Sequence, residues 1–314
     1  MIPEHDLIFN PAEYPIALGI DPGRLTRDST WVGHIPFAFA LVEMCRPQTI
    51  VELGTASGDS YCAFCQAVKQ LDLPTRCTAI DTWQGDPQHG VIGPEVLDGL
   101  RRAHDPHYAS FSTLVQATFD EALPSFADGS IDLLHVDGLH TYEAVRHDYE
   151  TWLPKVNPRT GVILFHDTRV PRPGYDVQRL WQEITPARDS FEFHHAFGLG
   201  VLVVGDDPPA RLVRFIRAAN SNPEVARGYF AELGASVERL RSFRYALMIT
   251  HRLINRIEEQ AGLGGSTGVD GLRQLTSQHD VNADPRGALR YLSALVQDLI
   301  VAHQDGKTRS TGRN

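Results

Sequence analysis

The stretch Thr-Ile-Val-Glu-Leu-Gly-Thr-Ala-Ser-Gly-Asp-Ser-Tyr, residues 49–61, decides how the rest of this chain can fold. Its β-branched start suits a buried strand, and apolar residues at helical spacing follow from 60 to 71. Gly54 and Gly58 free the backbone for a tight turn between the two. The pattern predicts the first strand–turn–helix unit of a doubly wound sheet, with a ligand over residues 54–60, at the helix N-terminus.

The acids around this turn indicate the kind of ligand. A dinucleotide fingerprint reads Gly-x-Gly-x-x-Gly, whereas this turn reads Glu52-x-Gly54-x-x-x-Gly58 and continues with Asp59. Two carboxylates would repel a pyrophosphate, but they suit a ligand with positive charge and no phosphate. S-adenosylmethionine, with its sulfonium and ammonium groups, is such a ligand. A tight turn in some other α/β protein is the alternative interpretation.

Further apolar runs alternate with helical segments, which is typical of an α/β sheet. The runs that we interpret as strands are 49–53, 76–80, 111–116, 130–136, 161–165, 191–195 and 199–204. Only residues 196–198 separate the last two runs, and so short a connection requires an antiparallel hairpin. We therefore predict a doubly wound, mostly parallel seven-stranded sheet with a terminal antiparallel hairpin and a C-terminal helical appendage.

Composition divides the chain into four predicted parts. These are an irregular N-terminal extension (1–30), a ligand-binding domain that opens with a helix over 31–45 (31–205), a helical appendage (206–304) and a disordered tail (305–314). In the appendage we predict helices over 210–233, 236–262 and 287–303. We expect the appendage to serve packing or contacts in a homo-oligomer.

Charge and apolar content exclude several classes of partner. The 314 residues carry a formal charge of −10 and are 42% hydrophobic, which favours a globular protein with small-molecule chemistry over a nucleic-acid binder. No basic segment followed by an apolar core opens the chain, and the longest apolar stretch, 35–44, is too short to span a bilayer. We expect a cytoplasmic protein with no membrane partner.

Cysteine usage leaves two interpretations open. Cys62 and Cys65 form a Cys-x-x-Cys on the helix after the glycine turn, which is compatible with a redox role. Cysteines three residues apart on a packed helix are more commonly small core residues, and a zinc site would need a second ligand pair.

The second strand and the segment after it suggest the nucleoside end of the ligand site. Asp81 ends that strand, where an acid can accept hydrogen bonds from ribose hydroxyls, and Trp83 follows at a position that suits the nucleoside. Phe119, just beyond the third strand, would meet an adenine. Residues 84–108 are rich in Gly, Pro and His around a short helix and form either a lid or a surface insertion.

Two later strands end in residues that carry chemistry. The fourth strand runs into Asp137-Gly-Leu-His140, and the fifth delivers His166 and Asp167. Neighbouring strand ends would place Asp137 and Asp167 together, and two close carboxylates need a cation or a shared proton. Carboxylates suit magnesium, whereas an adjacent imidazole favours manganese, iron or zinc. In the alternative interpretation, the two acids bond only loop amides.

The glycine turn, Asp81 and the hairpin ending together resemble the class I S-adenosylmethionine-dependent methyltransferases over about residues 31–205. Within that superfamily, residues 137–142, 152–154 and 165–167 look like the branch of metal-dependent macrolide-sugar O-methyltransferases. The resemblance implies a divalent cation, usually magnesium, held by an aspartate at the position of Asp137 and by an acid pair after the fifth strand. It also implies a histidine base at the position of His140. Here His166-Asp167 takes the place of the acid pair.

The predicted site follows from these residues and the resemblance together. We predict His140 as the base with His166 as its competitor, and Asp137, His166 and Asp167 as ligands of Mg²⁺, or of Mn²⁺ or another divalent cation. The predicted cofactor-binding residues are Glu52, Gly54, Thr55, Gly58, Ser60, Asp81, Trp83 and Phe119.

The predicted reaction methylates a hydroxyl of a sugar or another small natural-product or glycan acceptor. A nicotinamide oxidoreductase shares the doubly wound sheet, but the glycine spacing and the hairpin disfavour it. A non-catalytic S-adenosylmethionine-binding scaffold is the other alternative, and the presence of Asp137, His140 and Asp167 argues against it.

Overall fold

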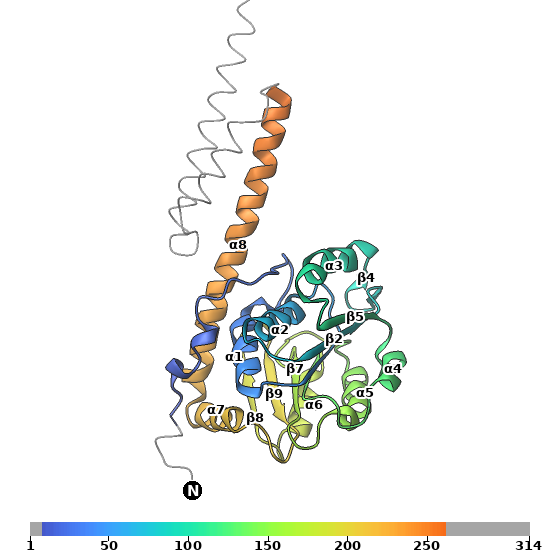
Figure 1. Ribbon diagram of the computed structural model, residues 1–314, viewed down its shortest axis with the longest axis vertical. Helices are drawn as coiled ribbons and strands as arrows, with labels where there is room; N and C mark the ends of the chain where they lie inside the picture. The colour runs from blue at the N-terminus through green and yellow to red at the C-terminus, as the bar shows by residue number, and fades with distance from the viewer. Residues whose placement is uncertain (1–7, 262–314) are drawn as a thin grey trace, which may run out of the picture. The chain divides into compact units, whose positions relative to one another are not determined.

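A computed structural model describes residues 8–261 of the chain (Figure 1). The chain divides into two compact units, with the boundary between Val237 and Glu238. The first unit contains the whole sheet and every predicted site residue. No helix among the described residues is both long enough and apolar enough to cross a bilayer.

Seven strands form the central sheet in the order β5-β2-β1-β6-β7-β9-β8. The first five of these strands are parallel, β9 is antiparallel to β7, and β8 is antiparallel to β9. The predicted α/β fold with its terminal hairpin is thus confirmed. The strand bounds are Thr49–Leu53 (β1), Arg76–Asp81 (β2), Ser112–Gln116 (β5), Leu133–Val136 (β6), Val162–His166 (β7), Ser190–Phe193 (β8) and Leu199–Val203 (β9).

The hairpin connection is longer than predicted, because β8 ends at Phe193 and β9 begins at Leu199. Ala196 and Phe197 have φ angles of 46° and 66°, in the left-handed region, so the chain leaves strand geometry there. Because β9 starts opposite His166 at the end of β7, this turn lies at the same sheet edge as the predicted site.

Helices cover both faces of the sheet (Figure 1). Successive side chains of each strand point to opposite faces of the sheet. Ile50 and Leu164 therefore pack with the helices on one face, and Val51 and Ile163 pack with the helices on the other. The first face carries α1 (Ile35–Cys45), α2 (Asp59–Gln70) and α7 (Ala210–Ser221). The second carries α4 (Phe119–Ala122), α5 (Tyr142–Trp152) and α6 (Val177–Ile184).

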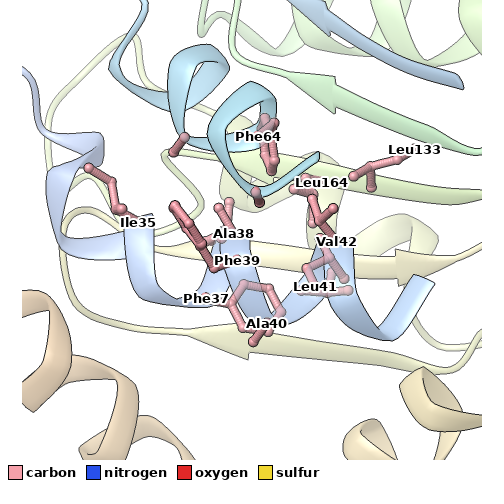
Figure 2. Close-up of a cluster of buried hydrophobic side chains, with 14 of the residues drawn as sticks. Ile35, Phe37, Ala38, Phe39, Ala40, Leu41, Val42, Phe64, Leu133 and Leu164 are labelled. Carbon is pink, nitrogen blue, oxygen red and sulfur yellow. The ribbon is translucent and has the colours of Figure 1, made fainter. Parts of the chain in front are cut away.

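The helix α1 is apolar on all sides and is buried accordingly. The helix predicted over 31–45 begins as a 3₁₀ turn, Trp31–His34, and becomes α-helical at Ile35. In Figure 2, Ala38 and Val42 of α1 lie on the side toward Phe64 of α2 and Leu164 of the sheet. Phe37 packs instead against Phe193 of β8, with ring centroids 4.5 Å apart.

The break predicted near residues 234–235 in the appendage is wrong. The chain breaks instead at Asn222, and α8 (Pro223–Ala261) runs on through Gly234. A Cβ on Gly234 would lie 2.1 Å from the Gly33 carbonyl oxygen, so this glycine allows a close backbone approach within the first unit. The helix predicted over 287–303 and the tail at 305–314 lie outside the described residues.

Two irregular segments contain short ordered pieces. The described part of the N-terminal extension holds two 3₁₀ turns, Pro11–Glu13 and Pro15–Ala17. The segment 84–108 holds a small antiparallel hairpin, β3 (Gly85–Asp86) with β4 (Gly90–Val91), followed by α3 (Pro94–Tyr108).

Candidate active site

The glycine turn lies where the ends of β1 and β6 meet. Gly54 has φ 84°, and a Cβ on it would lie 2.1 Å from the Asp137 carbonyl oxygen. Gly58 has φ 81° and donates its N–H to the Thr55 carbonyl at 2.7 Å, just before α2 begins. Only glycine fits at position 54, because any side chain would push the two strand ends apart.

Asp81 holds this turn in place. Its Oδ2 accepts hydrogen bonds from the amides of Thr55 (2.9 Å) and Ala56 (2.7 Å), and its Oδ1 accepts one from the amide of Trp83 (2.7 Å). Trp83 is buried, with φ 49°, and its Nε1–H donates to the Ala56 carbonyl at 2.9 Å. Both predicted nucleoside contacts therefore also shape the turn, and their role toward a ligand stays a prediction.

Glu52 lies at the end of a buried polar chain. The indole N–H of Trp31 donates to Nε2 of His135 at 3.1 Å, so Nδ1 of a neutral His135 carries the proton and donates to Oε2 of Glu52 at 2.8 Å. Burial raises the pKa of Glu52. Its other oxygen, Oε1, is buried without a hydrogen-bond partner.

Asp59 is buried and bonded within the protein. Its carboxylate accepts hydrogen bonds from the amide and hydroxyl of Thr26, both at 2.6 Å, and from the Ser57 hydroxyl at 2.8 Å. Asp59 thus ties the N-terminal extension to α2, and its role toward a ligand stays a prediction. Oε1 of Glu52 is the other carboxylate atom predicted to meet the positive groups of a ligand.

The remaining predicted cofactor residues line the same edge. Ser60 is buried in the first turn of α2, and the hydroxyl of Thr55 is buried without a hydrogen-bond partner. Phe119 opens α4, and its ring lies so close to Gly138 that a Cβ there would come within 2.6 Å.

Three predicted metal ligands meet at the ends of β6 and β7. Asp137, His166 and Asp167 each offer one ligand atom, and these atoms lie within 4.8 Å of one another. Nδ1 of His166 is 3.3 Å from Oδ1 of Asp137 and 3.2 Å from Oδ2 of Asp167. Asp167 has φ 60°, an uncommon angle for a residue with a side chain, and such strain is often found at functional sites.

The hydrogen bond at Nε2 of His166 determines whether Nδ1 of the neutral ring carries a proton or a lone pair. Nε2–H donates to the Ala196 carbonyl at 3.1 Å, so Nδ1 of a neutral ring is a bare lone pair. That lone pair would face two carboxylates, and three acceptors in one place require an extra proton or a cation. A divalent cation and an imidazolium both satisfy this arrangement.

His140 completes the cluster from the loop after β6. Its Nε2 lies 2.7 Å from Oδ2 of Asp167 and 3.7 Å from Oδ1 of Asp137. Its Nδ1 lies 2.9 Å from Oε1 of Gln88, and the Tyr175 ring stacks on the imidazole with centroids 4.6 Å apart. The structure thus brings together all four residues predicted for the chemistry.

The charges of the four groups depend on one another. Burial would lower the pKa of His140, but the carboxylates of Asp137 and Asp167 outweigh it and raise that pKa to about 9. Burial would also lower the pKa of His166, but the same two carboxylates raise it well above its usual value. Burial would raise the pKa of each of the two acids, but the positive His166 holds both below their usual values. Without a cation, two imidazolium rings balance two carboxylates.

Several of the remaining histidines and cysteines lie in the core. His135, His34 and Cys65 are fully buried, Cys62 is nearly so, and burial lowers the pKa of His34 so that it stays neutral. Burial raises the pKa of both thiols, which is consistent with core residues. His147 lies on the surface of α5 and pairs with Asp120.

Three residues at or near the site were not predicted from the sequence. Gln88 and Tyr175 reach His140 from the β3–β4 turn and from the loop after β7, neither of which has a periodic pattern. Asp148 of α5 is buried, no hydrogen bond to its carboxyl is found among the described residues, and burial raises its pKa to about 7. Its place in an amphipathic helix gave no sign of burial.

Comparison with known proteins finds likeness over the central part of the chain. Residues 51–168 match the family model described as a methyltransferase domain. The uncharacterized protein y4gI of Sinorhizobium fredii (strain NBRC 101917 / NGR234) is 44% identical over 213 residues, which are 67% of this chain. The match covers only 23% of that relative's length.

Solved structures with a distant likeness include two O-methyltransferases. TomG from Streptomyces achromogenes, in complex with SAM, is 16% identical, with 64% of this chain and 89% of that chain covered and a TM-score of 0.42. An O-methyltransferase from Bacillus cereus, in complex with SAH, is 14% identical, with 63% and 93% covered and a TM-score of 0.42.

Proposed function

We propose that this chain transfers a methyl group from S-adenosylmethionine to a hydroxyl oxygen of a small acceptor. The observation that carries the proposal is the cluster of Asp137, His140, His166 and Asp167 at the carboxyl edge of the sheet, beside the glycine turn. Ligands of doubly wound sheets bind at that edge, where the strand order reverses. The methyltransferase-domain match over 51–168 supports the same activity.

The glycine turn supports S-adenosylmethionine as the methyl donor. Oε1 of Glu52 and the Thr55 hydroxyl are buried polar atoms without partners, and such atoms cost about 1–3 kcal/mol each until they are satisfied. The ammonium group and hydroxyls of the cofactor would supply donors for them. We assign Asp81 to the ribose hydroxyls of the cofactor and Phe119 to its adenine ring. The backbone of the turn at Gly54, Gly58 and Ser60 would contact the rest of the cofactor. Trp83 would support this turn through its hydrogen bond to the Ala56 carbonyl.

The donor set of Asp137, His166 and Asp167 fits a divalent cation. Two carboxylate oxygens and one imidazole nitrogen lie within 4.8 Å of one another, which suits Mg²⁺, and the imidazole extends the choice to Mn²⁺. A bound cation would make an acceptor hydroxyl more acidic. One divalent cation with two neutral imidazoles also has the same charge as two imidazolium rings, so it can replace the two protons without leaving unbalanced charge.

His140 is the better placed of the two candidate bases. Methyl transfer needs an acceptor hydroxyl that loses its proton as its oxygen attacks the sulfonium methyl group. Nε2 of His140 lies 2.7 Å from Oδ2 of Asp167 and is not part of the cation set, so a cation that took up this carboxylate would leave Nε2 to the acceptor hydroxyl. In contrast, Nε2 of His166 is occupied by the Ala196 carbonyl, and its Nδ1 belongs to the cation set. We therefore assign proton removal to Nε2 of His140.

A sugar or a similar polyol is the acceptor class that this site supports best. Divalent cations of this type prefer oxygen ligands, and two adjacent hydroxyls of a sugar can approach one cation together. A natural-product sugar and a glycan offer the same hydroxyls, so we propose both as acceptors.

The test is methyl transfer to a panel of sugars, glycosides and phenols, with S-adenosylmethionine affinity measured by calorimetry. His140→Ala should lower turnover about 10²- to 10⁴-fold and leave cofactor affinity nearly unchanged, because the base acts only in the reaction step. His107→Ala, an exposed histidine of α3, is the control. If the chain failed to bind S-adenosylmethionine, or if His140→Ala kept full turnover, the proposal would be wrong.

A further inference from the structure

Gln88 connects three loops around His140. Its Oε1 accepts hydrogen bonds from the backbone amide of His140 at 3.0 Å and lies 2.9 Å from Nδ1 of the same residue. Its Nε2 donates to the Gly174 carbonyl at 2.7 Å. The half-buried side chain thus joins the β3–β4 turn to the loop after β6 and to the loop after β7.

These partners fix the chemistry of the amide. The Gly174 carbonyl can only accept, so the NH₂ group of Gln88 must face it and the amide oxygen must face His140. An amide oxygen can also only accept, so Nδ1 of His140 carries a proton and donates it. In a neutral His140 the lone pair is then on Nε2, which lies 2.7 Å from Oδ2 of Asp167, so the neutral ring requires a cation or a proton on that carboxylate.

We propose that Gln88 is a positioning residue that holds His140 in the tautomer with the proton on Nδ1 and aims Nε2 at the acceptor hydroxyl. This inference rests on the proposed function of His140 as the base. Histidine bases need a partner on the far nitrogen to fix ring orientation, and here a neutral amide fills that place. A neutral partner adds no third negative charge beside Asp137 and Asp167.

The β3–β4 turn is built to present this amide. Oδ1 of Asp86 accepts hydrogen bonds from the amides of Gln88 (2.6 Å) and His89 (2.9 Å), which closes the turn. The Tyr175 ring stacks on the His140 imidazole at an interplanar angle of 16°. The hydrogen bond from Nδ1 to Gln88 therefore restrains rotation of the imidazole within its plane, and the stacked Tyr175 ring restrains tilting of that plane.

The first experiment separates kcat from KM. Gln88→Leu should lower kcat about 10- to 100-fold, as loss of an orienting partner does, with the acceptor KM and the S-adenosylmethionine Kd within about twofold of wild type. Gln88→Glu keeps an oxygen that accepts from Nδ1, but it adds a third negative charge and cannot donate to the Gly174 carbonyl, so it should recover only part of the loss. Val91→Ala, at a residue of the same hairpin that is 95% exposed, is the matched control and should leave all three constants unchanged.

A second measurement reads the tautomer without turnover. The ¹⁵N shifts of the neutral His140 ring should show the proton on Nδ1 in wild type and a mixture of tautomers in Gln88→Leu. Full kcat in Gln88→Leu, or an unchanged tautomer, would overturn the inference while His140→Ala still loses turnover. If His140→Ala kept its turnover instead, the proposed base would be wrong.

Discussion

Side chains at the candidate site are arranged by hydrogen bonds to neutral acceptors. His166 donates to the Ala196 carbonyl and His140 to the Gln88 amide, so each ring directs its other nitrogen at Asp137 and Asp167. The backbone carbonyl and the amide keep their orientation whatever the protonation of the rings. The ring directions are therefore in place before a cation or an acceptor binds.

Asp148 should make stability depend on pH, because burial raises its pKa to about 7 from an ordinary value of 3.8. Below pH 4 the carboxyl is protonated in both the folded and the unfolded chain. As the pH rises from 4 to 7, the unfolded carboxyl ionises while the folded one does not, so folding loses stability. Asp148→Asn should then increase the free energy of unfolding by about 3 kcal/mol at pH 8 and hardly change it at pH 4.

Chemical denaturation at the two pH values measures this difference. Asp120→Asn, at an exposed neighbouring position, is the control and should change the free energy of unfolding by less than about 1 kcal/mol. An Asp148→Asn variant with equal effects at both pH values would show that the carboxyl is not held protonated.

Among the elements, the helix α8 shows a tertiary contact that overrides a sequence signal. Glycine usually marks the end of a helix, and this is why a break near Gly234 is predicted from the sequence. In the structure Gly234 lies inside the helix, and the Gly33 backbone passes where a side chain would be, which accounts for a glycine at a helical position. Such a contact between distant residues leaves no local pattern in the sequence.

Two glycines of α8 therefore should respond in opposite ways to the same substitution. A Cβ on Gly234 would lie 2.1 Å from the Gly33 carbonyl oxygen, whereas a Cβ on Gly228 meets nothing within 4 Å. Gly234→Ala should destabilise the fold by about 1–3 kcal/mol, the cost of overpacking. Gly228→Ala should stabilise it by roughly 0.5–1 kcal/mol through helix propensity. Thermal unfolding of the two variants decides this, and equal stabilisation would contradict the close approach.

Over the whole molecule, the features that depend on the order of the strands could be predicted from the sequence. Asp137 and Asp167 follow adjacent parallel strands, so their meeting at one edge follows from the pattern of strands and helices. The partners of Asp59 and Gln88 depend on loops instead. Thr26 of the N-terminal extension donates a hydrogen bond to Asp59, and the short β3–β4 hairpin brings Gln88 to His140. A homo-oligomer through the C-terminal helices stays a prediction, as do the domain boundaries proposed from composition.

The cation requirement of methyl transfer tests the proposed chemistry most directly, because it depends on Asp137, His166 and Asp167 acting together. The measurement is the rate at which S-adenosylhomocysteine forms with an accepted sugar, first in excess EDTA and then after Mg²⁺ or Mn²⁺ is restored. We predict that the rate falls at least about 100-fold in EDTA and recovers with either ion, and that Asp167→Asn prevents the recovery. Full turnover in EDTA, with Asp167→Asn as active as wild type, would contradict a cation-assisted reaction at this site.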